Sequence, residues 1–176
     1  TNAVTKHWMD WHYYNADIAT QNYFYSERWN DDFGVSSNIN TELSSSGYST
    51  TTSNNAWRLI RSSRACPYAG TLTKFIVTCE STGADADSDI EVAVWKGTRL
   101  ALDTAHTSGA NHTIAHLGTL TFDFSAASRF MSKELTSFNS TALAQADWIF
   151  ITVRKTTSGS DGRYYSIHST VLWDGA

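Results

Sequence analysis

Among the residues of this sequence that could bind a metal, the histidines have the spacing most like that of metal ligands. His112 and His116 in "NHTIAH" are four residues apart and would share one face of a helix, which is how a zinc site can begin. No Glu or third ligand stands nearby to complete such a site. His7 and His12 in "HWMDWH" are five apart, which places them on opposite faces of a strand. We therefore interpret the histidines as surface or packed residues, and we expect no metal.

Alternating carboxylates in "DADSD" are the second pattern with chemical potential. Asp85, Asp87 and Asp89 resemble the start of a calcium-binding loop, but such a loop would continue with Gly and reach a Glu between two helices. Here the strand-like "IEVAVW" follows directly, so a solvated turn is the better interpretation. The sequence also contains no phosphate-binding loop, no G-x-G-x-x-G, no G-x-S-x-G and no Cys-x-x-Cys motif. It offers no catalytic residues and no cofactor site, and we expect a protein that is not an enzyme.

A block of aromatic residues at positions 8–33 is the one feature with a functional character. Trp and Tyr rings have apolar faces and polar edges, which suit stacking on sugar rings and anchoring protein interfaces. For any single ring, packing in the core or in a subunit contact is the alternative. The block holds no consistent period, however, so a wholly buried role for all of it is not expected. The candidate binding or interface residues are Trp8, Trp11, Tyr13, Tyr14, Tyr23, Tyr25 and Trp29.

Charge and hydropathy argue against two kinds of partner. The chain has 13 basic and 17 acidic residues and a net charge of −4, whereas a nucleic-acid partner requires a clustered positive surface. No run approaches the roughly 20 apolar residues of a membrane-spanning helix. We therefore expect neither nucleic-acid binding nor membrane insertion.

The two cysteines are predicted to be free thiols. Cys66 precedes the turn-like "PYAG", and Cys79 closes the strand-like "TLTKFIVTC". At about 3.3 Å per residue, this strand would carry Cys79 roughly 25 Å from the turn. A disulfide requires Cα atoms within about 4–7 Å of each other. Free thiols also fit a protein made in a reducing cytoplasm.

Strand-like segments alternate with turn-like segments from residue 57 onwards. Leu120, Phe122 and Phe124 alternate with polar residues, the pattern of a strand with one buried face. For residues 125–139, both a short helix and a bridging loop stay open. The expected strands are 56–63, 71–79, 89–96, 99–105, 117–125, 147–155 and 163–173. We predict an all-β fold, an antiparallel jelly-roll-like β-sandwich with at most one short helix.

This pattern divides the chain in two. Residues 57–176 are predicted to form the β-sandwich domain, and residues 1–56 an aromatic and polar N-terminal segment for attachment or subunit wrapping. Residues 1–33 are expected to lie along the outside of the sandwich, with several of the aromatic candidates at contacts between chains. The last two expected strands carry apolar residues on both faces, which one sandwich need not fully cover, so we expect a homotrimer.

The segment "RACPYAGTLTKFIVTCES", residues 64–81, resembles a pattern in tailed-bacteriophage fibre and virion proteins, where a Pro-Tyr-x-Gly turn leads into a strand beginning Thr-Leu. Four later segments resemble further parts of the pattern in the same order, so the resemblance spans roughly residues 57–174. They are "DIEVAVWKGT", "LTFDFS", "FNSTALAQADWIFITVRKT" and "YYSIHSTVLWD". The turn before the penultimate strand usually carries Gly-Asp, where this chain has Ala146-Asp147. The aromatic first third has no counterpart in the pattern.

The resemblance implies a homotrimeric jelly-roll-like domain on the virion exterior, made in the cytoplasm of a bacterial host. The expected function is that of a non-enzymatic fibre or receptor-binding domain that recognises a host surface glycan or protein. Other virion proteins would be its further partners. Two alternatives stay open: a purely structural head-decoration or virion adaptor protein, and a carbohydrate-binding module.

Overall fold

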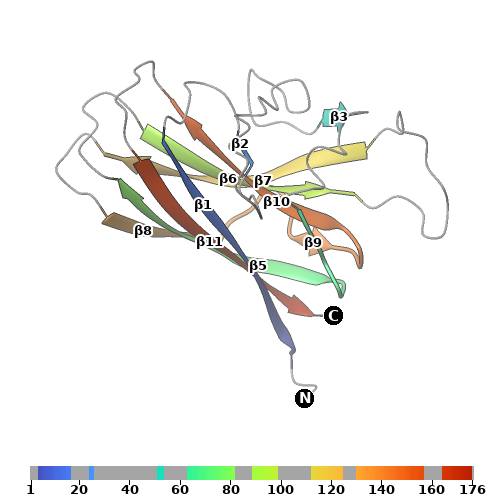
Figure 1. Cartoon of the computed structure of the whole chain (residues 1–176). Coiled ribbons are helices and arrows are strands. Elements are labelled where there is room, and N and C mark those ends of the chain that lie inside the picture. Colours follow the sequence, from blue (N-terminus) through green and yellow to red (C-terminus); the bar gives the residue numbers. More distant parts are fainter. Residues whose placement is uncertain are drawn as a thin grey trace.

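The computed structural model of this chain describes residues 4–16, 24–25, 51–53, 63–81, 89–98, 112–124, 130–156 and 164–175. All of their regular structure is β-strand, in two antiparallel sheets that pack face to face (Figure 1). Within these ranges no helix has the length and hydropathy needed to cross a membrane. The predicted fold class, an antiparallel β-sandwich, is confirmed.

Sheet A holds the two strands nearest the ends of the chain. Its order is β1 (Lys6–Ala16), β11 (Tyr164–Gly175), β5 (Gly70–Ser81) and β8 (Phe130–Leu135), with β9 (Ala142–Leu143) paired to the start of β5. Sheet B has the order β2 (Phe24–Tyr25), β10 (Trp148–Lys155), β6 (Asp89–Gly97), β7 (His112–Asp123) and β3 (Thr51–Ser53), and β4 (Arg64–Ala65) pairs with β10. Every pairing is antiparallel.

Eight of these strands pair in a nested order. β1 pairs with β11, β2 with β10, β5 with β8, and β6 with β7, so the outermost strands in the sequence meet and the innermost form a hairpin. β11 then joins β5 within sheet A, and β10 joins β6 within sheet B. This arrangement is a long antiparallel hairpin wrapped into two layers, which defines a jelly roll.

The strands β5, β6, β7, β10 and β11 confirm the sequence prediction for their segments, although β7 begins earlier than expected, at His112. β11 lies between β1 and β5, so this strand is interior to its sheet and is paired along both of its edges. Almost all of the strand expected at 56–63, and all of that at 99–105, lies outside the described residues.

Two expectations need correction. Residues 130–135, within the segment left open between helix and loop, form the strand β8, because Met131 and Leu135 pack on the core while the strand pairs with β5. The boundary at residue 56 does not separate a wrapping segment from the sandwich. β1 is a full strand of sheet A, in register with β11 over all of its residues, and β2 and β3 extend sheet B.

The core lies between the two sheets and is built from alternate residues of each strand. In β11 these are the odd-numbered residues from Tyr165 to Trp173, the polar Ser169 included, while the even-numbered residues point away from sheet B. Large aromatic side chains such as Phe75, Phe122 and Trp173 fill the space between the layers. Burial of each such ring contributes roughly 1.5–3 kcal/mol, which makes this layer the main source of stability.

Both cysteines are buried and free. Cys79 is a core residue of β5, and Cys66 follows β4. Burial raises the pKa of the Cys66 thiol to about 12, with a further contribution from the carboxylate of Asp147. Burial alone raises the pKa of the Cys79 thiol. Both side chains are therefore held as neutral thiols.

The turn before β10 forms backbone hydrogen bonds with the residue that follows β4. Cys66 donates its N–H to the carbonyl of Asp147 at 2.6 Å, and Ala146 donates its N–H to the carbonyl of Cys66 at 2.7 Å. The buried Asp147 carboxylate accepts the N–H of Ala144 at 2.9 Å. Ala146 sits at a φ of 65°, a left-handed conformation that favours glycine. It is the position at which the pattern that the sequence resembles usually carries Gly.

Candidate functional site

The outward face of sheet A at β1 and β11 carries exposed side chains. Its residues are the even-numbered ones of the two strands, because the odd-numbered ones turn toward sheet B. Trp8 is 67% exposed, a high value for so large an apolar side chain. We call this surface the open face of sheet A, formed by Trp8, Asp10, His12, His168, Thr170 and Leu172.

Polar side chains of the open face are held in a defined arrangement. His12 and His168 are direct cross-strand partners, and their rings stack with centroids 4.3 Å apart at an interplanar angle of 4°. The Thr170 hydroxyl donates a hydrogen bond to Asp10 Oδ1 at 2.6 Å. His168 Nε2 lies 3.8 Å from the same oxygen, which makes an ion pair only when the imidazole is protonated.

An apolar strip adjoins this polar group. Trp8 pairs across the strands with Leu172, and Leu172 pairs with Lys74 of β5, whose ammonium forms an ion pair with Glu134 at 2.8 Å. The open face therefore presents an exposed indole beside carboxylate, hydroxyl and imidazole groups. Such a surface suits recognition of a partner through one aromatic anchor and several hydrogen bonds. The described residues contain no group of three or more His, Cys, Asp or Glu side chains that would hold a metal ion.

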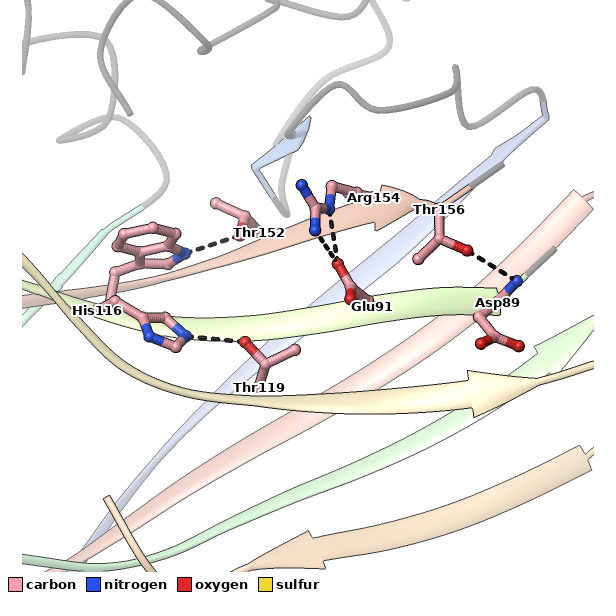
Figure 2. A network of polar contacts seen from close by, with 8 residues as sticks. Asp89, Glu91, His116, Thr119, Thr152, Arg154 and Thr156 are labelled. Atoms are coloured by element: carbon pink, nitrogen blue, oxygen red, sulfur yellow. Dashed lines mark hydrogen bonds and ion pairs between the residues drawn. The ribbon is translucent and has the colours of Figure 1, made fainter. Parts of the chain in front are cut away.

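The outward face of sheet B is closed by contrast. Trp95 and Phe150 are fully buried there, and their rings stack with centroids 6.1 Å apart, while Trp148 stacks on Phe150 at 5.4 Å. Trp95 Nε1 donates a hydrogen bond to Thr152 Oγ1 at 2.8 Å (Figure 2). These aromatic side chains stabilise the fold and are not available to a partner from solution.

A row of polar contacts crosses sheet B beside this aromatic layer (Figure 2). Arg154 Nε donates to Glu91 Oε2 at 2.6 Å across β10 and β6, and the N–H of Asp89 donates to Thr156 Oγ1 at 3.3 Å. Burial, followed by the nearby carboxylates of Asp123 and Glu91, raises the pKa of the Asp89 side chain. The row links neighbouring strands across one sheet.

His116 is a half-buried residue of this region. Its ring meets Trp95 edge to face at 5.0 Å, and its Nε2 shares a hydrogen bond with Thr119 Oγ1 at 2.8 Å. Burial lowers the pKa of His116 to about 4, although the backbone of Gly118 and the charge of Glu91 act in the opposite direction. His116 is therefore neutral near pH 7. It lies on the strand β7, so the helix face it was considered to share with His112 does not form.

The aromatic residues proposed from the sequence as binding or interface candidates lie in different environments. Trp8 lies on the open face, whereas Trp11 is fully buried in the core. The interface role expected of Trp11 is corrected for this reason: it is an odd-numbered residue of β1 and turns toward sheet B. Tyr13 and Tyr14 occupy β1, and Tyr25 occupies β2, but their side chains are not among the described ones. Tyr23 and Trp29 lie outside the described residues.

Asp10, His12 and His168 are not recognisable as a group from the sequence. His12 and His168 are far apart in the chain, and only the pairing of β1 with β11 brings their rings together. The segment 163–173 was expected to be a strand, but the aromatic block that contains His12 shows no consistent period. Residues 6–16 were not among the expected strands, so their pairing with the last strand was not predicted.

Comparisons with known proteins leave the family of this chain open. No family model matches the chain, and no curated protein matches it. Among solved structures, a chain of Desmodium yellow mottle tymovirus is similar with 10% sequence identity, over 99% of this chain and 90% of that chain, with a TM-score of 0.28. A TM-score this low supports no inference about fold or function.

Proposed function

We propose that this chain is a non-enzymatic structural protein of a virus particle. The observation that carries the proposal is the nested pairing of eight of the described strands, β1 with β11 through to β6 with β7. Jelly rolls of this kind form viral coat domains, and also lectins and cupins. The resemblance of residues 57–174 to tailed-phage fibre and virion proteins favours the first of these classes.

The finer proposal is an exterior fibre or receptor-binding domain that works as a homotrimer and recognises a host surface glycan or protein. Support comes from the open face of sheet A, where the exposed Trp8 stands beside Asp10 and the two stacked histidines. An exposed ring flanked by hydrogen-bonding groups suits both kinds of ligand. The alternative is a purely structural head-decoration or adaptor protein, in which the same face contacts another virion protein.

The location of the protein in purified particles tests the proposal. Antibodies raised against this chain should label intact virions, and the chain should be present in their protein content by mass spectrometry. Gold particles at the distal ends of fibres support the receptor-binding role, and gold spread over the head supports the decoration role. Absence of the chain from purified particles would refute both.

Binding assays with the isolated protein distinguish a receptor-binding role from a purely structural role. The wild-type protein should bind host cells or a glycan array, and Trp8→Ala should reduce that binding by about tenfold or more, the loss typical of a central aromatic anchor. Phe130→Ala is the matched control, because Phe130 is 66% exposed on β8 of the same sheet. Equal binding by all three proteins would remove the open face from the proposal. Glycan binding by a monomer that is absent from virions would favour a carbohydrate-binding module.

A further inference from the structure

Among the described strands, β1 lies at an edge of sheet A, and the strand itself lacks the features that usually prevent pairing with another strand. It forms eleven residues of unbroken register with β11, and its only described partner strand is on that side. It contains no Pro, no Gly and no bulge, and its charged residues are Lys6 and Asp10. Sheet edges are commonly blunted by short strands, charges, bulges or Pro. β8, at the opposite edge of sheet A, is short at six residues and carries Lys133 and Glu134.

We propose that the edge of β1 facing away from β11 pairs antiparallel with β1 of a second copy of this chain, about a two-fold axis at Trp11. The backbone N–H and C=O groups that point away from β11 would then find partners, as in other cases of strand addition at a sheet edge. The two copies of sheet A would become one continuous sheet. Their open faces would lie side by side on the same surface.

The sequence of β1 selects this register. When Trp11 lies on the axis, all eleven residues of each strand are paired. The residue numbers of two opposing residues then add up to 22. Asp10 of one copy then opposes His12 of the other, and this pair occurs twice. Opposing residues share a face in an antiparallel pair, so both pairs lie on the open face. Trp8 opposes position 14, a tyrosine.

Other symmetric registers are poorer. An axis at Asp10 would set the two Asp10 carboxylates directly opposite each other, and like charges in that position are destabilising. An axis at His12 would oppose the two His12 rings and leave Lys6 and His7 without partners on the second strand. The register centred on Trp11 therefore combines the longest overlap with a carboxylate opposite an imidazole, two groups that can share a hydrogen bond.

The groups around the proposed contact are already ordered within one chain. His12 is stacked on His168, and Asp10 accepts a hydrogen bond from Thr170, so neither side chain needs to be immobilised entirely by the second copy. The contact is isologous and therefore joins chains in pairs. It goes beyond the proposed function and is separate from a three-fold contact, which would have to use other surfaces.

Engineered cysteines test the register directly. Asp10→Cys chains mixed with His12→Cys chains should form a disulfide-linked dimer under mild oxidation, because opposing residues lie about 4.5–5.5 Å apart between Cα atoms, within the span of a disulfide. Either variant alone should give little dimer. Two copies of position 10 are offset by two residues along the strands and lie roughly 8 Å apart, which is too far. The buried native thiols of Cys66 and Cys79 should not compete.

Association of the wild-type protein gives the second measurement. Light scattering should show pairs of the 19.5 kDa chain, or pairs of trimers, with a weight-average mass that rises with concentration. Trp8→Lys should raise the dissociation constant by about tenfold or more, whereas Phe130→Lys at the other edge should leave it unchanged. A mass that shows no pairing up to about 100 μM would overturn the proposal. Cross-linking that is no better in the mixture than in either single variant would overturn the register.

Discussion

Replacement of Trp11 by Ala tests whether β1 belongs to the folding unit. Trp11 is fully buried, and Trp8, three residues earlier on the same strand, is 67% exposed. Removal of a buried Trp side chain leaves a cavity in addition to the lost transfer free energy, and the usual cost is about 3–5 kcal/mol. Since whole domains are stable by only about 5–15 kcal/mol, Trp11→Ala should remove a large part of the free energy of unfolding.

The matched substitution Trp8→Ala should cost about 1 kcal/mol, because only a third of the ring is removed from water in the native state. For a domain of this length, each kcal/mol corresponds to about 2–4 °C in Tm. We therefore expect Tm to fall by about 10 °C for Trp11→Ala and by about 3 °C for Trp8→Ala. Deletion of residues 1–16 should prevent cooperative folding, because it removes a complete strand of sheet A.

Equilibrium urea unfolding followed by circular dichroism measures these effects without relying on tryptophan fluorescence. Measurements at two protein concentrations separate association from folding. Equal destabilisation by the two substitutions, or a truncated chain that unfolds cooperatively with an unchanged midpoint, would show that β1 wraps the sandwich from outside. The reasoning from its register and from the burial of Trp11 would then be wrong.

Three further predictions concern the interior. Ala146→Gly should raise the free energy of unfolding by about 0.5–1 kcal/mol in urea titrations, because glycine adopts the φ of 65° without the cost to an L-residue. The greater freedom of glycine in the unfolded chain partly offsets this gain. A destabilised variant would contradict the prediction. The wild-type protein should lose stability as pH falls from about 6.5 to about 4, since His116 takes up a proton in the unfolded chain but not in the native protein. His116→Gln should flatten the pH dependence of the free energy of unfolding in this window. An unchanged slope would count against the lowered pKa of His116. Cys66 and Cys79 should react with a thiol reagent at pH 8 only after unfolding, two groups per chain, because burial raises the pKa of both thiols; rapid labelling of the native protein would show otherwise.

Local alternation determined much of the sheet content of this protein. Leu120, Phe122 and Phe124 alternate with polar residues, and the sequence therefore predicted β7, just as the apolar segments 147–155 and 163–173 predicted β10 and β11. The residues after 125 show where such reasoning fails. "RFMSKEL" contains residues suited to a helix, yet part of it forms β8 because the edge of β5 provides a partner and the core accepts Met131 and Leu135.

The sequence by itself determined the all-β class, several strands and the free state of the two cysteines, because alternation and chain reach are properties of neighbouring residues. Only the tertiary structure decided that β1 belongs to sheet A, that Trp11 is core while Trp8 is exposed, and that His12 meets His168. These facts depend on which strands pair across nearly the whole length of the chain and on which face of a strand meets the opposite sheet. A one-residue change in register reverses the face of every side chain, and no local pattern in the aromatic first third fixes that register.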